Sequence, residues 1–546
     1  TWSDTVNITG DIIVPEGITL TVSAGTTVQF LALNDETAGG NNASRSELLI
    51  QGSLVIEGTE AKPVILTSTA STPAAGDWDG IRQTGKGELT LRHTTIEYAS
   101  LGVDYQVDGE FSVSPTIENS TIRHTKGRGL YLEAKGGANL TASVQNNTIH
   151  SNTEYGVYLS ASESNTKLNA TVSNNQVYNN KYGISLEGSS SSNSAFTALL
   201  NKNQVHDNGS YGIYVQSRSA TNELQILGNT IYACGDAGLY LKNDSSTGTF
   251  TSLIEGNTLR KNKNVGLYVH NFRGEHRPLV RQNTVFNNEG NGLQFEQYDN
   301  YYYYYSGTLQ PEITLNEVHD NHGHGLSIST NQSATVVHNS IYDNKKNGIY
   351  LLKSNDVSHI NFNNIYGNEG DYALYNNSSA SVDARYNWWG AALTQEMEAG
   401  NNPKNITAHL FDIYDNDSKG IVDYSDWFSA EQPLSSMPIS WIKTPANKTS
   451  MKAVDKIEGS AVAPIAIVRV EVSTDGGKTW EPASGSSHWS YDWTVPGEGI
   501  YLIQSRVITA DGIGTQVAEN TVTIDNSLTT TSGELTADET WSDTVN

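Results

Sequence analysis

The chain has 546 residues and a formal net charge of −26, with 36% hydrophobic and 17% charged residues. It is rich in Asn, Ser, Thr and Gly, a composition that favours strands and turns over helices. The negative charge argues against nucleic-acid binding, and the single cysteine, Cys234, excludes a disulfide scaffold and a four-cysteine zinc site. Because no run of 18 apolar residues occurs, we expect no membrane span. We expect a soluble, β-rich protein that is extracellular or lies at the cell surface.

The first part of the chain consists of short segments in which apolar and polar residues alternate. Three of them are TWSDTVNITGDIIVPEGITLTVSAGTTVQF (1–30), GSLVIEGTEAKPVILTS (52–68) and GDWDGI (76–81). Alternation with a period of two predicts short strands.

One pattern then recurs along the middle of the chain. It reads Asn-x-(Ile/Val/Leu)-x-x-Asn and is followed, two or three residues later, by Gly-(Ile/Leu/Val)-x-apolar. Copies start at Asn147, Asn175, Asn203, Asn229, Asn257, Asn283, Asn316 and Asn339, and degenerate copies start at Ser120 and Asn363. A period in the twenties with alternating apolar residues predicts one solenoid coil of short strands per repeat. We expect one continuous β-helix over residues 1–430, with about sixteen coils at the usual strand spacing.

Each position of the repeat has an expected role. Apolar residues such as Ile149, Val157 and Leu159 should point inward and stack on the next coil. The Gly should sit at a tight bend with a positive φ: Gly156, Gly183, Gly212, Gly238, Gly266, Gly292, Gly325 and Gly348. Asn at the sixth position should form an amide ladder inside a turn: Asn152, Asn180, Asn208, Asn262, Asn288, Asn321, Asn344 and Asn368. Cys234 occupies this position in one copy, as a small buried residue rather than a reactive thiol.

These repeats resemble the parallel β-helix repeats of the pectate-lyase-like superfamily, which are usually right-handed. The N-terminal segments quoted above resemble the first coils of secreted members, while YNWWG (386–390) and VDYSDWF (422–428) resemble their last coils. The resemblance implies an all-β fold with a right-handed parallel β-helix. It implies little about activity, because enzymes and inert scaffolds share this fold.

A second domain is expected after a Pro-containing hinge at residues 431–440. Residues 441–526 contain short alternating segments and turn sequences such as TDGG, which predict a small β-sandwich. VEVSTDGGKTW and WSYDWTVPGEGIYLIQSRV resemble bacterial immunoglobulin-like modules of surface proteins. Residues 527–546 are interpreted as a linker and the first strand of a next tandem unit, because TWSDTVN occurs at residues 1–7 and again at 540–546.

Two clusters could carry chemistry on such a fold. A lyase needs a basic residue near acidic groups, and FRGEHRPLVRQ supplies Arg273, Glu275, His276, Arg277 and Arg281; the alternative is a solvated loop. A metal site could use imidazoles, which are supplied by His319, His322, His324 and His338. The alternative for His319 is an outward column that it shares with His150, His206, Tyr178, Tyr232, Tyr342 and Tyr366.

Calcium is a candidate cofactor. The segment DNDSKGIVDYSD resembles an EF-hand-type loop, with the carboxylates of Asp415, Asp417, Asp423 and Asp426 as metal ligands. Lys419 departs from that pattern and no helix-forming run flanks the segment, so an ordinary acidic turn is the alternative.

Tyrosine is the most regular outward-facing residue of the repeat. We expect a row that contacts a glycan or a partner, or that stiffens the sheet: Tyr131, Tyr158, Tyr214, Tyr240, Tyr268 and Tyr350. The insert QYDNYYYYYSG adds a Tyr-dense protrusion, including Tyr301 and Tyr303, as a contact surface.

The repeated heptapeptide favours a structural unit of a long extracellular fibre or adhesin that catalyses nothing. Its partners would be the next copy of the same unit, joined head to tail, and glycans or neighbouring fibres. The junction between units would involve Thr1, Trp2, Leu535, Thr540 and Trp541. The alternatives are a polysaccharide lyase or epimerase on a β-helix, and a non-catalytic glycan-binding module.

Overall fold

The computed structural model describes residues 1–528, except 84, 190–193, 219–221, 299–306, 400–408, 433–437, 446, 464–466, 487, 511 and 514–516. The chain divides into two compact units, Thr1–Gln432 and Pro433–Asn546. Each unit has its own apolar core.

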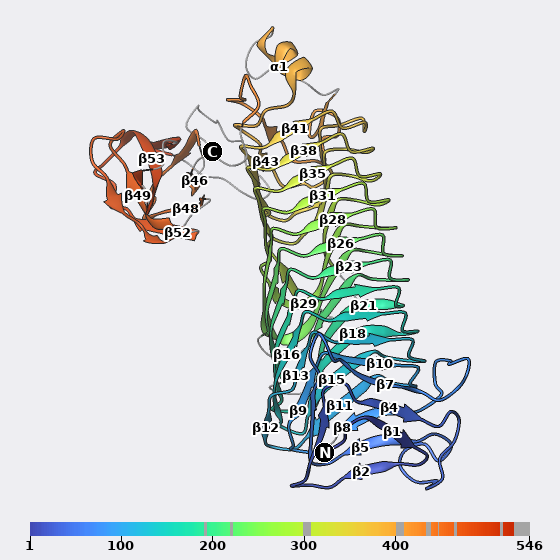
Figure 1. Cartoon of the computed structure of the whole chain (residues 1–546). Coiled ribbons are helices and arrows are strands. Elements are labelled where there is room, and N and C mark those ends of the chain that lie inside the picture. Colours follow the sequence, from blue (N-terminus) through green and yellow to red (C-terminus); the bar gives the residue numbers. More distant parts are fainter. Residues whose placement is uncertain are drawn as a thin grey trace, which may run out of the picture. The chain divides into compact units, whose positions relative to one another are not determined.

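The first unit is a parallel β-helix whose coils stack like the rungs of a ladder (Figure 1). One face is a 14-stranded parallel sheet. Its strands are β1 (Thr5–Ile8), β4 (Thr27–Phe30), β7 (Val64–Ser68), β10 (Thr94–Glu97), β14 (Thr121–Arg123), β17 (Thr148–His150), β20 (Gln176–Tyr178), β23 (Gln204–His206), β26 (Thr230–Tyr232), β28 (Thr258–Arg260), β31 (Thr284–Phe286), β35 (Glu317–His319), β38 (Ser340–Tyr342) and β41 (Asn364–Tyr366). This sheet has 14 strands, one per coil, which is slightly fewer than the sixteen coils expected from the sequence.

The other strands of the β-helix form two further columns, which are joined into one sheet by the long strands β27 (Leu239–Glu255) and β29 (Leu267–His276). The column that follows the Gly of each repeat contains β2 (Ile12–Val14), β5 (Glu47–Ile50), β8 (Gly80–Gln83), β11 (Val103–Asp108), β15 (Leu130–Lys135), β18 (Tyr155–Ala161), β21 (Tyr182–Gly188), β24 (Ile213–Ser217), the start of β27, β29, β32 (Leu293–Gln297), β36 (Leu326–Ser329), β39 (Ile349–Lys353), β42 (Leu374–Asn376) and β44 (Leu410–Phe411). The last column contains β3 (Thr19–Ser23), β6 (Ser53–Glu57), β9 (Leu89–Arg92), β12 (Ser112–Val113), β13 (Thr116–Glu118), β16 (Asn139–Gln145), β19 (Lys167–Ser173), β22 (Ala195–Asn201), β25 (Asn222–Leu227), the end of β27, β30 (Leu279–Arg281), β33 (Gly307–Leu309), β34 (Glu312–Thr314), β37 (Thr335–Val337), β40 (Ser358–Asn361), β43 (Val382–Asp383) and β45 (Val422–Asp423).

Successive coils pair in register, so equivalent residues of the repeat lie directly above one another. Ile149 pairs with Val177, and Val177 with Val205. All three are fully buried, as are Val157 and Leu159 of the following strand. The inward and outward positions therefore alternate as the sequence pattern predicts.

Two ladders of buried asparagine run along the β-helix. The predicted ladder is confirmed: Asn180 Nδ2 donates to Asn208 Oδ1 at 3.2 Å and to the Ile149 carbonyl. The first Asn of each repeat forms a second ladder that sequence analysis did not predict; Asn203 Nδ2, for example, donates to Asn229 Oδ1 at 2.9 Å. Each amide satisfies backbone groups at a turn where no strand can pair them.

The glycine of the repeat does not have the expected positive φ. The left-handed residues are those that precede each ladder Asn, such as Lys202 and Asp207. The glycine is needed because the next coil approaches closely. A Cβ on Gly212 would lie 2.5 Å from Ile231 Cγ2 and 2.6 Å from the Gly238 carbonyl oxygen.

The last coils carry a short helix, α1 (Ala391–Glu398), which lies beyond β41 at the end of the solenoid (Figure 1). It follows Gly390, whose φ of 85° ends the preceding extended segment. Leu393 and Met397 are its buried apolar residues, so the helix covers apolar side chains of the final coils.

The second unit consists of two small sheets around a separate core that includes Ile457, Trp489 and Ile503. One sheet contains β46 (Ile439–Thr444), β48 (Lys456–Val462), β52 (His488–Asp492) and β51 (Ser484–Gly485). The other contains β47 (Thr449–Met451), β55 (Ala518–Ile524), β53 (Gly499–Thr509), β49 (Ile467–Ser473), β50 (Glu481–Pro482) and β54 (Gly512–Ile513). This arrangement is sandwich-like, and its assignment as an immunoglobulin-like module stays a prediction.

Candidate active site on the tyrosine face

Aromatic rings form a stacked column along the 14-stranded sheet. His206 stacks between Tyr178 and Tyr232, with ring centroids 4.9 and 4.6 Å apart, and Arg260 covers the Tyr232 ring at 4.3 Å. Farther along, the column contains Phe286, His319, Tyr342, Tyr366 and Trp388. The column predicted for His319 is thus present. Its members are held by one another, which is a structural role.

A different outward surface combines aromatic and ionisable side chains. We call it the tyrosine face; it consists of the outward side chains of β15, β18, β21, β24, the start of β27, β29 and β32. One in-register row contains Tyr131, Tyr158, Ser185, Tyr214, Tyr240, Tyr268 and Gln294. The parallel row, two residues later on each strand, contains Glu133, Ser160, Glu187, Gln216, Lys242, His270 and Glu296.

The tyrosine rings of this face pack against one another. Tyr240 and Tyr268 are stacked at 4.8 Å with an interplanar angle of 7°, and Tyr131 and Tyr158 lie 5.1 Å apart. Arg128 covers the Tyr131 and Tyr158 rings at 4.3 and 5.0 Å. Because stacked rings hide each other's faces, they offer hydroxyl groups and ring edges rather than open faces. Tyr350 belongs to the same row farther along and stacks on Tyr375.

Four residues from three successive coils form a hydrogen-bonded cluster on this face. The Tyr268 hydroxyl donates to Glu296 Oε2 at 2.5 Å. His270 Nδ1 lies 3.2 Å from the Tyr268 hydroxyl and 3.3 Å from the Tyr240 hydroxyl. The imidazole nitrogen therefore lies within hydrogen-bonding reach of two phenols, one of which is bound to a carboxylate.

Burial sets the protonation states of the cluster. It lowers the pKa of His270, with Lys242 acting in the same direction and Glu296 opposing it, so the imidazole is neutral at neutral pH. Burial also raises the pKa of the Tyr240 and Tyr268 hydroxyls, which stay protonated. The cluster thus combines a neutral base with two protonated phenols, the components of acid–base catalysis.

Lys242 adds a positive charge next to the cluster. It is in register with His270 on the neighbouring strand, and its ammonium group lies over the Phe272 ring at 4.6 Å. Among the described residues it has no hydrogen bond or ion pair with an acidic side chain.

Sequence analysis named the tyrosines of this site but not His270, Glu296 or Lys242. The signal was present in the aligned segments GLYLK (238–242), GLYVH (266–270) and GLQFE (292–296). Each segment begins with the Gly that precedes the strand. The residues two and four positions after this Gly point outward on the same face. Aligning the residue four positions after each Gly places Lys242, His270 and Glu296 side by side and so predicts the cluster.

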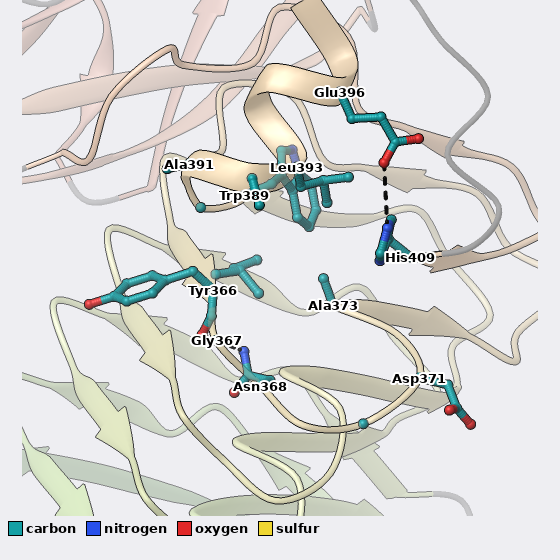
Figure 2. Close-up of a pocket in the computed structure, with 14 residues that line it drawn as sticks. Tyr366, Gly367, Asn368, Asp371, Ala373, Trp389, Ala391, Leu393, Glu396 and His409 are labelled. Carbon is teal, nitrogen blue, oxygen red and sulfur yellow. Dashed lines mark hydrogen bonds and ion pairs between the residues drawn. The ribbon is translucent and has the colours of Figure 1, made fainter.

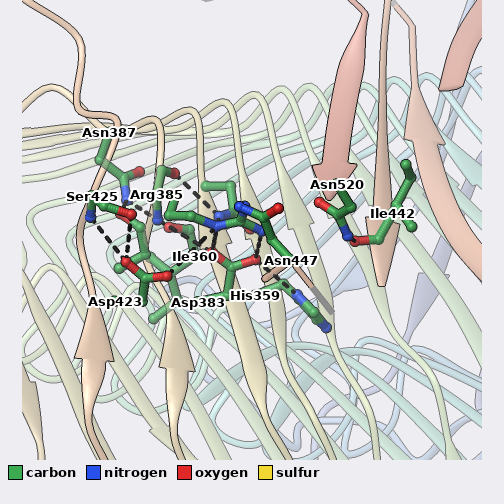
Figure 3. A network of polar contacts seen from close by, with 12 residues as sticks. His359, Ile360, Asp383, Arg385, Asn387, Asp423, Ser425, Ile442, Asn447 and Asn520 are labelled. Carbon is green, nitrogen blue, oxygen red and sulfur yellow. Dashed lines mark hydrogen bonds and ion pairs between the residues drawn. The ribbon is translucent and has the colours of Figure 1, made fainter. Parts of the chain in front are cut away.

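The predicted calcium ligands do not converge. Asp415 Oδ2 accepts a hydrogen bond from the Asp412 amide at 3.0 Å, whereas Asp423 binds Ser425 and lies 3.9 Å from Arg385 (Figure 3). Asp417 and Asp426 are exposed. Among the described residues, no group of three or more His, Cys, Asp or Glu side chains is placed to hold a metal. The turn is organised instead by Asp412, whose carboxylate accepts from the Tyr414 and Val422 amides.

Arg385 lies at the centre of a group of polar contacts in the last coils. Its guanidinium donates to both oxygens of Asp383, at 2.8 and 2.9 Å, and Asn361 donates to the same carboxylate (Figure 3). The bond from Asn361 links β40 to β43, and Asp423 lies at the edge of this network.

The side chains of residues 273–281, which were candidates for a lyase site, do not lie together. His276 points into the core, where it stacks on Phe250, while Glu275 forms an ion pair with Arg277 at 2.6 Å. Arg273 lies 3.7 Å from Asp244, and Arg281 binds Glu255. Alternation along β29 and β30 sends these side chains in different directions, so they form no common site.

The histidines considered for a metal are likewise separated. His319 lies in the ring column, His324 stacks on Tyr350, and His338 is buried beside Phe362. His322 is exposed. They occupy different columns of the coil and therefore do not converge.

The residues predicted for the junction between units lie mostly outside the described residues, as do Tyr301 and Tyr303. Leu535, Thr540 and Trp541 belong to this group. Thr1 is exposed, and Trp2 forms a backbone bridge with Val22 on the first coil.

A cavity of about 330 Å³ lies under α1 at the end of the solenoid (Figure 2). Trp389, Leu393 and Ala373 line it, and Glu396 and His409 form an ion pair at its edge with an N–O distance of 3.6 Å. Residues 400–408, which separate α1 from His409 in the sequence, lie outside the described residues. The cavity therefore carries no functional assignment.

Comparisons with known proteins agree with the fold. A family model described as a right-handed β-helix region matches residues 50–198, 194–306 and 298–388. A search of curated protein sequences found no match. Two solved structures of the periplasmic alginate epimerase AlgG, one of them of a mutant, are similar over 59% and 60% of this chain and 75% and 74% of theirs. Their sequence identities are 15% and 16%, and their TM-scores are 0.44 and 0.37.

The expectation that the chain catalyses nothing is corrected by this finding, because the solved structures found similar to it are of an enzyme. Their low identity says nothing about the substrate of this chain. Across the part of the chain that the structure describes, no helix is long and apolar enough to cross a membrane.

Proposed function

This chain belongs to the right-handed β-helix family, and on that premise we propose that it is an enzyme acting on an acidic polysaccharide, in the class of lyases and epimerases. Such enzymes remove a proton next to the carboxylate of a uronate unit. The observation that carries the proposal is the hydrogen-bonded cluster of Tyr240, Tyr268, His270 and Glu296 beside Lys242.

Stacking of the coils does not by itself require the ionisable residues of this cluster. Ser160, Ser185 and Gln294 occupy the same rows on other coils, so strand pairing does not demand a histidine or a second phenol at these positions. Three ionisable groups of different type lie on adjacent coils in the order Lys242, His270 and Glu296. Ionisable groups of different type gathered in this way are typical of catalytic sites.

The chemistry of the cluster fits a uronate. The ammonium of Lys242 can pair with the sugar carboxylate, which makes the adjacent C–H more acidic by stabilising the developing negative charge. The neutral imidazole and the phenols can then accept and donate protons. An uncharged sugar would leave the Lys242 charge unused.

The rest of the tyrosine face would hold the flanking sugar units. The partly exposed side chains of Glu133, Tyr158, Glu187 and Tyr214 lie in its two rows, where an extended polymer could make hydrogen bonds on successive coils. The glycan contacts expected from the tyrosine row belong to this proposal. An extracellular or cell-surface location belongs to it as well, since structural polysaccharides lie outside the cytoplasm.

The test is incubation of the purified full chain with polymers of mannuronate, guluronate, galacturonate and glucuronate, and with uncharged glucan and mannan. Proton NMR of the products would detect both bond cleavage and a change of configuration. We expect modification of at least one acidic polymer and of neither uncharged polymer.

The matched variants are Lys242→Gln and Lys202→Gln, the latter at an exposed turn between β22 and β23. Lys242→Gln should lower kcat/KM by about tenfold or more, which corresponds to one lost charge interaction of roughly 1.4 kcal/mol. Lys202→Gln should have no effect. Unchanged polymers, or equal effects of the two variants, would contradict the proposal.

A second candidate function is favoured by the repeated heptapeptide at residues 1–7 and 540–546. We propose that such β-helix and sandwich units follow one another head to tail in an extracellular fibre or adhesin, with the next copy as partner. Sequencing of the coding region around this segment tests it: further copies at a spacing of 539 residues support the tandem array, and a single copy contradicts it. Catalysis on the tyrosine face is compatible with either result.

A further inference from the structure

The first coil of the β-helix has a free edge. Its strands β1 and β2 lie at the blue end of the solenoid (Figure 1), and among the described residues each pairs with one strand, β4 and β5 respectively. From this edge and the repeated heptapeptide we infer a docking site. The segment Thr540–Asn546 of a second copy adds to the free edge of β1 and joins the copies head to tail. The inference needs neither catalysis nor a tandem array in the coding region.

The inward side chains of the first coil are less buried than their equivalents on the second coil. Val6 is half-buried, whereas Val28, its partner in register, is fully buried. Ile12 is half-buried, whereas its partner Leu48 is fully buried. Trp2 is half-buried as well and packs against the same core. The first coil therefore keeps apolar surface that a further strand can bury.

The backbone of β1 is unpaired on the same side. The Thr27 amide donates to the Asp4 carbonyl at 2.8 Å, so the groups at this position point towards β4. Because successive residues of a strand direct their amides and carbonyls to opposite edges, those of Thr5 and Asn7 point away from β4. In the described part of the chain no strand pairs with β1 on that side. Such an edge is a template for one more strand.

The occupant is identified by its sequence. Residues 540–546 read TWSDTVN, as residues 1–7 do. Equivalent residues of successive coils lie above one another in this β-helix, and parallel strands of identical sequence stack in the same register. Placed on β1 in this way, the segment covers Trp2 with its own tryptophan and Val6 with its own valine. It therefore buries the apolar surface that the first coil leaves uncovered.

The contact joins two different parts of the chain. Each copy can donate its segment 540–546 to one neighbour and accept the segment of another on β1. A contact of this kind does not close on itself, so it builds open chains of copies rather than rings.

The same register brings two carboxylates together. Asp4 is exposed, and Asp543 of the added strand would lie directly beside it. Like charges opposite each other on neighbouring strands are destabilising. Docking should therefore be strengthened by salt, which screens the repulsion, and by a positive charge at residue 543.

The experiment traps the contact with a disulfide between two full-length variants, Thr5→Cys and Thr544→Cys, mixed under mild oxidation. Neighbouring strands place these positions about 4.8 Å apart, which a disulfide can span. We expect links between residues 5 and 544, detected by mass spectrometry, and none from the natural chain, whose Cys234 is buried. Ser532→Cys lies in the same tail outside the repeat and should link to Thr5→Cys at least about tenfold more slowly, the ratio of 1.4 kcal/mol.

Further variants test the register. Asp543→Lys, added to the Thr544→Cys chain, should raise the linking rate about threefold at low salt. Asp4→Lys in the other chain should then remove this gain, because two lysines face each other. Val545→Asp should slow linking, since it places a charge on apolar surface. The free peptide TWSDTVN should compete, and a peptide with the same residues in another order should not.

Three results would overturn the inference. Equal rates for Thr544→Cys and Ser532→Cys would show that no docking site exists. Links of Thr544→Cys to Thr27→Cys in place of Thr5→Cys would show that the segment replaces β1 rather than adding to it. A chain with both Thr5→Cys and Thr544→Cys that links only within itself would exclude a contact between copies. Each of these results leaves the proposed catalysis and the tandem array to their own tests.

Discussion

At the scale of single residues, Cys234 is informative because it stands in the sixth-position amide ladder, where neighbouring coils carry Asn. It is fully buried, and burial raises the pKa of its thiol to about 12. Its amide donates to Asn262 Oδ1, as the ladder requires, but its side chain supplies no amide to the coil before it. The prediction of a small buried residue at this position is confirmed.

Cys234→Asn should stabilise the β-helix. The oxygen of the new side chain would accept a hydrogen bond from the Asn208 amide, and its amide group would donate to Asn262 Oδ1. Asn180 donates to Asn208 Oδ1 in the same way. Restored buried hydrogen bonds contribute about 1 kcal/mol, which should raise the Tm measured by circular dichroism. Cys234→Ala, which adds no amide, is the control; equal Tm values for the two variants would contradict the ladder account.

The buried His276 should make stability depend on pH. Burial lowers its pKa from 6.5 to about 3, and Nε2 contacts the Ser252 hydroxyl. The folded state therefore binds fewer protons than the unfolded state, so the stabilisation is complete above pH 6.5 and is lost as pH falls towards 3. At pH 5 the loss is on the order of 2 kcal/mol.

His276→Gln removes this titration while keeping a group that can bond Ser252. We expect its Tm to fall less than that of the natural chain between pH 7 and pH 4.5. The exposed His322 supplies the control His322→Gln, which should follow the natural chain. A pH profile for His276→Gln that is parallel to the natural one would show that His276 does not titrate on unfolding.

At the scale of the coil, the glycine of the repeat limits how closely neighbours can stack. Gly212→Ala would place a Cβ within 3.0 Å of three atoms of the next coil, including Cys234 Sγ. Relieving such overlap costs about 1–3 kcal/mol, so Tm should fall. Gly209→Ala, three residues earlier, has its nearest neighbour 3.7 Å away and should be tolerated. Equal tolerance of both variants would contradict the close approach.

The sequence predicts the features that repeat and misses those that depend on how coils meet. The inward positions and the sixth-position Asn ladder follow from alternation and spacing alone. The role of Gly212 could not be read in the same way, because its constraint comes from Ile231 and Gly238 on the following coil. Likewise, His270 meets Tyr240 and Glu296 only through strand register, which varying coil lengths conceal.

The predicted calcium ligands show a second limit of reading sites from sequence spacing. Asp415 and Asp423 have the spacing of a calcium loop, but one lies in a turn and the other on β45 beside Arg385. In a solenoid, residues close in sequence separate into different columns of the coil. Spacing along the chain is therefore a weaker guide to a site here than position within the repeat.

At the scale of the whole β-helix, stacking converts a local motif into a long surface. The seven strands of the tyrosine face span on the order of 30 Å at the usual strand spacing. The cluster of Tyr240, Tyr268, His270 and Glu296 lies towards one end of this row, with β15, β18, β21 and β24 on one side of it. A polymer would therefore be held mainly on that side of the reacting unit.

The most direct measurement is a crystal structure of the protein with a product oligosaccharide of the acidic polymer that it modifies. The account predicts a sugar chain that runs along the tyrosine face, with one carboxylate at Lys242 and the ring of that unit beside Tyr240, Tyr268 and His270. A sugar bound only to the ring column of the 14-stranded sheet or to the second unit would contradict it.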